Sequence, residues 1–359
     1  MEKAMIAMSG GVDSSVAAYL SLKMGLQCIG ATMRLFTNDV LGDSQQSSCC
    51  SLDDTEDARS VAYRLGMRFY VFNFSQDFRE MVMDDFVSCY EQGLTPNPCI
   101  RCNRYLKFQK LLERATILGC DTVVTGHYAR IMQDKSSGRY LLYKALDKSK
   151  DQSYVLYSLT QYQLSHLLLP LGELTKEQVR SIAEGQGFVN AHKKDSQDIC
   201  FVPDGDYVAF MERYTGKAYP GGDYLDLAGK VVGHHQGAVR YTIGQRKGLN
   251  LAMGRPVYVC GKDMQANTVT VGDDSDLYKT TLIAGDGNFL PFDELTGPME
   301  VLAKARYRMT EQPATISPLP DGKIQVVFHQ SQRALTPGQA VVFYDGDMVI
   351  GGATIESVE

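Results

Sequence analysis

Seven residues near the start of the chain, SGGVDSS at positions 9–15, bring together groups that bind a phosphate. They follow a short apolar run and lead directly into apolar, helix-forming residues. A strand, a glycine turn and a helix in this order present backbone N–H groups to an anion. Gly10 and Gly11 allow a ligand to approach the backbone, the serine hydroxyls add donors, and Asp13 can hold a Mg²⁺ that accompanies the phosphates. The segment therefore predicts a nucleotide-binding loop.

The spacing of this loop excludes two common phosphate-binding motifs. No lysine closes it as in a P-loop, and no third glycine lies in register for a dinucleotide-binding fingerprint. Its residues instead resemble the pyrophosphate loop of enzymes that cleave ATP between the α and β phosphates and adenylate an acceptor. An ordinary Gly-Gly turn is the alternative, but seven residues in order at the first strand–helix junction favour nucleotide binding.

Two cysteines form the second chemically informative group. Cys99 and Cys102 lie in the segment NPCIRCN at positions 97–103, just ahead of a helix that we predict over 105–118. A helix N-terminus and nearby arginines favour the thiolate form of Cys102, which is the species needed for nucleophilic attack. About 100 residues later, Cys200 lies in the polar segment DSQDICF at 195–201.

Other uses of the cysteines fit the sequence less well. Cys99 and Cys102 could be half of a zinc site with Cys49 and Cys50, but adjacent cysteines lack the usual ligand spacing. A thioredoxin-type dithiol lacks its surrounding fold pattern. The remaining cysteines stand among apolar or helical neighbours and are predicted to be buried thiols: Cys28, Cys89, Cys120 and Cys260.

The elements that must position these groups alternate between strand-like and helix-like stretches over the first 200 residues. Strands are predicted over 3–8, 28–33, 69–73 and 122–125, and helices over 14–24, 55–65, 77–92, 105–118 and 176–186. This alternation indicates an α/β fold, a Rossmann-like parallel sheet with helices on both faces. Ligands bind beyond the carboxyl ends of such strands, so we expect the loop, Met33 and Gly126-His127 to converge.

The character of the chain changes after residue 205. Residues 206–280 are rich in glycine loops with short strands, and residues 281–359 are strongly β, with a hairpin signal at Asp345-Gly346. The sequence thus predicts three domains: an adenylation domain over 1–205, a small central domain over 206–280, and a C-terminal β-barrel over 281–359.

The composition of the chain limits which partners and which cellular compartment we expect. The net charge of the 359 residues is −6, so any nucleic-acid contact must use local basic patches. The first residues carry no signal-peptide pattern, and no segment approaches the ~18 apolar residues of a membrane span. We therefore expect a cytoplasmic protein without membrane contact, in which the nine cysteines are not structural disulfides.

Seven motifs occur in an order that resembles one family over essentially the whole chain, the tRNA-specific 2-thiouridylases (the MnmA/TrmU family of PP-loop ATP pyrophosphatases). Besides the loop at Ser9, they are Thr95-Pro96-Asn97-Pro98-Cys99-x-x-Cys102-Asn103, Thr125-Gly126-His127-Tyr128-Ala129-Arg130, Lys150-Asp151-Gln152-Ser153-Tyr154, Ser196-x-Asp198-Ile199-Cys200-Phe201, Tyr241-Thr242-Ile243-Gly244-Gln245-Arg246-Lys247-Gly248-Leu249 and Ala305-Arg306-Tyr307-Arg308.

The resemblance implies that the enzyme replaces the C2 oxygen of the wobble uridine of tRNA by sulfur. ATP, with Mg²⁺, would adenylate that oxygen, releasing pyrophosphate and later AMP. Sulfur would arrive from a donor protein, a cysteine desulfurase or a sulfur-relay carrier, as a persulfide on Cys200. Cys102 would be the nucleophile, and the two cysteines would end as a transient disulfide.

The resemblance also assigns binding residues. Those for ATP are Ala7, Met8, Ser9, Gly10, Gly11, Val12, Asp13, Ser14, Met33 and Gly126. Those for tRNA are Asn97, Pro98, Cys99, His127, Lys150, Asp151, Gln152, Arg306, Tyr307 and Gln339.

Cys99 departs from the family pattern, in which many members carry an aspartate read as a general acid/base. The chain therefore has a set of three thiols: Cys99, Cys102 and Cys200. Three thiolates could instead hold a [4Fe–4S] cluster whose open iron carries the sulfide, and this alternative to the persulfide stays open.

Three rival functions also stay open. An amide-forming ATP pyrophosphatase would not need the cysteines, and a tRNA-binding module would bind tRNA without releasing pyrophosphate. A 4-thiouridine synthetase would be expected to carry an RNA-binding domain ahead of the loop.

Overall fold

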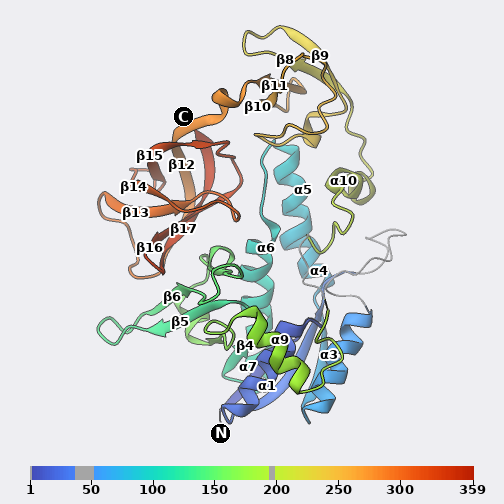
Figure 1. Ribbon diagram of the computed structural model, residues 1–359, viewed down its shortest axis with the longest axis vertical. Helices are drawn as coiled ribbons and strands as arrows, with labels where there is room; N and C mark the ends of the chain where they lie inside the picture. Colours follow the sequence, from blue (N-terminus) through green and yellow to red (C-terminus); the bar gives the residue numbers. More distant parts are fainter. Residues whose placement is uncertain (1, 37–51, 194–198) are drawn as a thin grey trace. The chain divides into compact units, whose positions relative to one another are not determined.

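The computed structural model describes residues 2–36, 52–193 and 199–359 (Figure 1). The chain divides into two compact units. The first comprises Met1–Met83, Pro98–Asp206 and Asp347–Ile350, and the second Asp84–Asn97, Tyr207–Gly346 and Gly351–Glu359. Of the residues singled out above, Cys49, Cys50, Ser196 and Asp198 lie outside the described residues.

The first unit is built on a five-stranded parallel sheet in the order β3-β2-β1-β4-β7. Its strands are β1 (Lys3–Ala7), β2 (Gln27–Arg34), β3 (Arg68–Asn73), β4 (Thr122–Val124) and β7 (Leu167–Leu168). The first four strands confirm the sequence prediction. From β1 the chain adds β2 and β3 on one side and β4 on the other, which creates a topological switch point where ligands bind in such sheets.

Both faces of this sheet are covered. Alternate residues of β1, Ala4 and Ile6, join a core built with helices α1 (Val12–Lys23), α3 (Leu52–Arg64) and α9 (Lys176–Gly185). Met5, which points to the opposite face, is also fully buried. Burial on both faces explains why the strand reads as a continuous apolar run.

The helix that carries Cys99 and Cys102 begins earlier than the sequence analysis expects. It runs through α6 (Pro98–Arg101), the π-helix η2 (Cys102–Lys110) and α7 (Leu111–Ile117). The expectation that Cys102 lies ahead of the helix is wrong, because Pro98 occupies the first helical position, where its missing N–H costs nothing. Cys99 therefore lies in the first helical turn and Cys102 one turn inside, where a π-helical segment begins.

Several elements of the first unit lie outside the sequence expectations. The hairpin of β5 (Ala129–Gln133) and β6 (Tyr140–Lys144) follows β4 and is paired from Ala129↔Lys144 to Gln133↔Tyr140. Short helices follow at η3 (Ser153–Val155) and α8 (Gln161–Ser165). By contrast, α4 (Ser75–Phe78) and η1 (Arg79–Met83) fall in the helix predicted over 77–92, which continues to Glu91. Capping boxes start α8 at Thr160 and α9 at Thr175.

The second unit contains α5 (Asp84–Glu91), α10 (Tyr207–Thr215), a four-stranded sheet and a β-barrel. The sheet has the order β10-β11-β8-β9, with β8 (Gly222–Leu225), β9 (Val231–His235), β10 (Tyr258–Asp263) and β11 (Thr268–Gly272). The turns η4 (Ala238–Arg240) and η5 (Asp274–Leu277) belong to the same region.

The barrel has six strands in the order β12-β15-β14-β13-β16-β17, closed by pairing of β12 with β17. They are β12 (Tyr278–Phe289), β13 (Met299–Lys304), β14 (Gln312–Pro318), β15 (Ile324–Arg333), β16 (Ala340–Asp345) and β17 (Met348–Val358). The turn at Gly346 matches the hairpin signal, and the predicted fold class is confirmed. Among the described residues, no helix is long and apolar enough to cross a membrane.

Candidate active site

The loop between β1 and α1 is held in shape by its own serines. The Ser14 hydroxyl accepts a hydrogen bond from the Ser9 N–H at 3.2 Å and donates to the Gly11 carbonyl at 3.0 Å. Ser15 donates to the same carbonyl at 3.1 Å. Asn190 adds bonds of 2.9 Å from its amide to the Gly10 carbonyl and the Ser15 hydroxyl. The Gly10 and Gly11 carbonyls of the loop are thus hydrogen-bonded within the protein. This suits a loop that presents its N–H groups to an anion.

Gly10 and Gly126 leave no room for a side chain, because backbone atoms of other elements lie close to them. Gly10 has φ +76°, and a Cβ there would lie 2.2 Å from the backbone oxygen of Asp54 in α3. Gly126 follows β4, and a Cβ there would lie 2.8 Å from the Ser14 nitrogen in α1. The structure therefore brings the residues after β1 and after β4 together, as the parallel order predicts.

Asp13 is the most heavily contacted side chain of the loop. Its carboxylate accepts hydrogen bonds from the Lys176 ammonium, at 2.7 and 2.8 Å, and from the Tyr128 hydroxyl at 2.8 Å. Two groups thus donate three hydrogen bonds to this carboxylate. A carboxylate can accept about four, so a Mg²⁺ on Asp13 stays a prediction. Sequence reasoning missed Lys176 and Asn190, which belong to no phosphate motif, whereas Tyr128 lies in a motif already singled out.

His127 follows Gly126 and is held by Thr125. Its Nδ1 lies 2.8 Å from the Thr125 hydroxyl, and its ring lies 5.7 Å from that of Phe108. Desolvation by the surrounding protein, followed by the positive charge of Lys107, lowers its pKa well below the usual value. The imidazole is therefore neutral at pH 7.

This depressed pKa predicts a loss of stability in acid. Between the two pKa values the unfolded chain binds more protons, so the free energy of unfolding falls as pH drops below about 6.5. The slope from this one group is at most about 1.4 kcal/mol per pH unit. We expect His127→Gln to lose less stability than the wild type between pH 7.5 and 5.5 in urea titrations. Equal losses in the two proteins would show that the fold does not lower the pKa of His127.

The three thiols of interest differ in exposure. Cys99 is exposed, Cys200 is half-buried, and Cys102 is 8% exposed. The helix around Cys102 is fixed by Asn103, whose amide donates to the Val155 carbonyl at 3.1 Å. Next to Cys200, the Phe201 ring packs edge-on against Phe78 at 5.6 Å.

These thiols do not form a metal site as arranged. Among the described residues, no group of three or more His, Cys, Asp or Glu side chains lies close enough to hold a metal ion. A four-iron cluster holds its cysteine ligands further apart than a single ion does, so a [4Fe–4S] cluster on Cys99, Cys102 and Cys200 stays an alternative prediction. The other cysteines fit the buried reading in part: Cys28 and Cys120 are buried, whereas Cys89 and Cys260 are half-buried. Burial raises the pKa of the Cys28 and Cys260 thiols to about 11.

The segment from Lys150 to Gln152 runs close to Tyr128. The Gln152 side chain accepts from the Tyr128 N–H at 3.0 Å, and the Gln152 N–H donates to the Tyr128 carbonyl at 2.9 Å. The Asp151 carboxylate accepts from the Ala145 N–H and from the Ser153 hydroxyl. Asp151 and Gln152 therefore shape the chain locally, and their contact with tRNA stays a prediction.

Residues of the second unit that are predicted to contact tRNA also make hydrogen bonds within the protein. Arg306 donates to the Ala334 carbonyl and, at 2.7 Å, to the Thr336 hydroxyl. Gln339 donates to the Thr95 carbonyl at 2.7 Å and so holds the segment that leads to Asn97. Tyr307 is 42% exposed, which leaves part of its ring open to a stacked base.

Three family models match successive parts of the chain. They are described as the tRNA methyl transferase HUP domain, which matches residues 2–204, the tRNA methyl transferase PRC-barrel domain, which matches 208–273, and the aminomethyltransferase beta-barrel domain, which matches 279–355. The first alone spans more than half of the chain.

Curated relatives match along the whole length. The tRNA-specific 2-thiouridylase MnmA of Clostridium acetobutylicum is 49% identical over 355 residues, which is 99% of each chain. The protein of the same name from Clostridium perfringens is 50% identical over 358 residues, again 99% of each chain. Among solved structures, a 4-thiouridine synthetase complexed with RNA and ATP is 18% identical, with a TM-score of 0.35, covering 59% of this chain and 50% of that one. A likeness at that level supports no argument about function.

Proposed function

The chain belongs to the tRNA-specific 2-thiouridylase family, and from this membership we propose that it thiolates C2 of the wobble uridine in an ATP-dependent reaction through an adenylated uridine and cysteine-borne sulfur. The observation that carries the proposal is the preformed loop at the switch point of the sheet. The helix with Cys102 and the segment with Cys200 belong to the same compact unit.

Adenylation answers a chemical need, because the C2 oxygen of uracil is a poor leaving group. In the proposed first step this oxygen attacks the α-phosphorus of ATP, a P–O bond forms, and pyrophosphate departs. The N–H groups at the start of α1 receive the phosphate charge. Residues Ala7 to Ser14, Met33 and Gly126 form the proposed ATP site.

Sulfur transfer follows on the cysteines. A donor protein leaves a persulfide on Cys200. The Cys102 thiolate attacks the Sγ atom of Cys200, and the bond between this Sγ and the outer sulfur breaks. This forms a Cys102–Cys200 disulfide and releases hydrosulfide, which adds to C2 and expels AMP. Alternatively, the persulfide attacks C2 directly, and the same disulfide forms afterwards. Two electrons from a dithiol reductant then restore both thiols for the next turnover.

Neither proposed step passes through a metal. Mg²⁺ would accompany the ATP phosphates, and a cluster on the three thiols is the alternative route for the sulfur. The proposed tRNA contacts are Asn97, Pro98, Cys99, His127, Lys150, Asp151, Gln152, Arg306, Tyr307 and Gln339. A cysteine desulfurase or sulfur-relay protein is the proposed sulfur donor, and the cytoplasm is the proposed compartment.

The test is mass spectrometry of tRNA nucleosides after incubation of the enzyme with unmodified tRNA, ATP and a sulfide source. We expect 2-thiouridine at the wobble position, together with one pyrophosphate and one AMP per thiouridine formed. Omission of ATP should remove the product. Unmodified uridine in the complete reaction would contradict the proposal.

A further inference from the structure

Lys176 is a buried lysine whose charged end reaches the phosphate loop. It is the first residue of α9, only 8% exposed, and its Nζ lies 2.7 and 2.8 Å from the two carboxylate oxygens of Asp13. The same ammonium lies 5.9 Å from the centre of the Tyr128 ring. Tyr128 in turn donates its hydroxyl to Asp13. Lys176 and Tyr128 therefore hold one carboxylate together.

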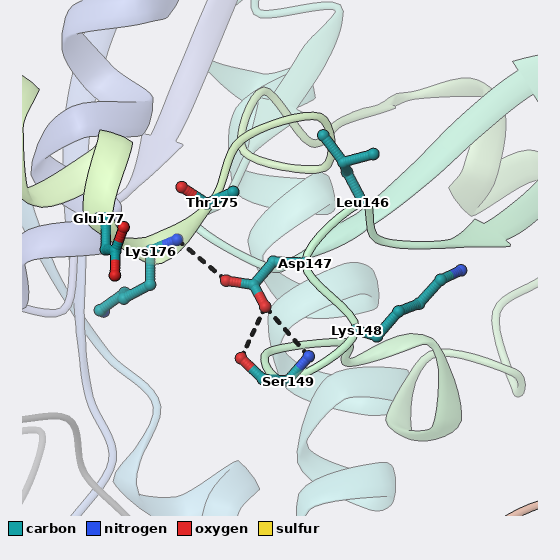
Figure 2. A pocket seen from close by; sticks show the side chains of 7 residues that line it. All are labelled: Leu146, Asp147, Lys148, Ser149, Thr175, Lys176 and Glu177. Atoms are coloured by element: carbon teal, nitrogen blue, oxygen red, sulfur yellow. Dashed lines mark hydrogen bonds between the residues drawn. The ribbon is translucent and has the colours of Figure 1, made fainter.

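The start of α9 is fixed on its other side. Thr175 and Gln178 form a capping box, and the Asp147 carboxylate accepts a hydrogen bond from the Lys176 N–H at 3.0 Å (Figure 2). The other oxygen of Asp147 is held by the N–H and hydroxyl of Ser149, at 3.0 and 2.6 Å. These bonds, foremost that from the Ser149 hydroxyl, lower the pKa of Asp147, so it is ionised at neutral pH. The backbone of Lys176 is thereby anchored.

The hollow around this helix start is not itself a candidate anion site. It measures about 560 Å³ and is lined by Leu146, Asp147, Lys148, Ser149, Thr175, Lys176 and Glu177. Thr175 and Asp147 already accept from N–H groups at the start of α9. The side chain of Lys176 makes its charged contact with Asp13. The positive charge of Lys176 therefore acts on Asp13 of the phosphate loop, and not on a ligand in this hollow.

The contact between Lys176 and Asp13 changes the net charge beside the phosphate loop. Asp13 lies in the first turn of α1, where the N–H groups attract phosphate. An unneutralised carboxylate at that point would repel the same phosphate. A lysine held by both carboxylate oxygens cancels the charge, and the Tyr128 hydroxyl fixes the orientation of the carboxylate.

We propose that Lys176 is a positioning residue of the adenylation site, which neutralises and orients Asp13 so that the loop accepts the phosphates of ATP. The inference rests on the proposed function, since it assigns a role within the same ATP site. Lys176 acts through Asp13, and the anchored start of α9 keeps its ammonium in place.

The test compares Lys176→Met with Lys176→Arg, which keeps the charge, and with Lys135→Met, the same change at an exposed hairpin position. Calorimetric ATP binding is measured for each protein, together with KM and kcat for tRNA-dependent pyrophosphate release. We expect Lys176→Met to weaken ATP binding and raise KM about 30-fold, because the Asp13 carboxylate beside the phosphates loses its neutralising partner. Lys176→Arg should recover most of this loss, and Lys135→Met should match the wild type.

A second pair of variants tests the route through Asp13. In an Asp13→Asn background, the further change Lys176→Met should cost less than about 3-fold in ATP affinity, because no carboxylate charge is left to neutralise. An equal loss in both backgrounds would overturn the proposal, as would wild-type ATP binding by Lys176→Met. Measurement of ATP binding tests the role of Lys176 separately from the thiolation reaction. A wild-type protein that binds ATP but makes no 2-thiouridine would contradict the proposed function and leave the role of Lys176 measurable.

Discussion

When a cysteine desulfurase and cysteine supply the sulfur, replacement of Cys200 by serine is expected to lower 2-thiouridine formation by at least about 1,000-fold, while pyrophosphate release continues. Serine cannot carry a persulfide, so the sulfur step has no donor atom. Adenylation uses the loop and the tRNA and needs no thiol. ATP–pyrophosphate exchange and nucleoside mass spectrometry, run on the same samples, separate the two steps.

Cys102→Ser should lose thiolation to the same extent, since its hydroxyl cannot release the persulfide sulfur. Cys260→Ser is the matched control, a half-buried thiol in the second unit whose raised pKa keeps it protonated. It should retain wild-type activity. Full thiolation by either Cys102→Ser or Cys200→Ser would contradict cysteine-borne sulfur.

A substitution at Cys99 distinguishes the persulfide mechanism from the cluster mechanism. Cys99 is exposed, whereas Cys102 is buried, and the persulfide route uses only Cys102 and Cys200. Cys99→Asp should therefore keep thiolation within a few-fold of the wild type. Loss of activity together with loss of protein-bound iron in this variant would favour the cluster.

Gly10→Ala is expected to have the second large effect. A residue with φ +76° strains any side chain by about 1–2 kcal/mol, and the new Cβ would lie 2.2 Å from the backbone oxygen of Asp54. Because Asp54 O belongs to helix α3, relief requires movement of the loop or the helix, and the total cost is about 2–4 kcal/mol of folding free energy. We expect the melting temperature to fall by roughly 5–10 °C.

The same change should weaken ATP binding more than 10-fold, because the N–H groups that receive the phosphates move with the loop. Gly25→Ala is the control, since it has φ +83° but no atom within 4 Å of the new Cβ. It should lose only about 1–2 kcal/mol of stability and leave ATP affinity unchanged. Equal effects of the two substitutions would show that backbone strain alone, and not the contact with α3, governs the loop.

Local patterns were enough to predict the sheet and its layers. The apolar runs that became β1 and β2 and the helical stretch after Ser9 reappear in the structure close to the predicted bounds. The cysteine helix starts earlier than predicted, because a proline favours both a turn and the first position of a helix, and Pro98 takes the helical position. No sequence prediction covers the β5–β6 hairpin, because its strands carry no clear alternation and its turn, Lys135-Ser136-Ser137, lacks a two-residue hairpin signal.

The sequence by itself determined the phosphate loop, the order of the motifs and hence the family, because these depend on neighbours along the chain. Tertiary structure alone decided which groups hold the loop. Lys176 is 163 residues from Asp13, and Asn190 is 180 residues from Gly10. No periodicity or motif links residues so far apart, because only packing of α9 beside α1 brings them into hydrogen-bonding distance. The same packing makes Asp13 the partner of a buried lysine.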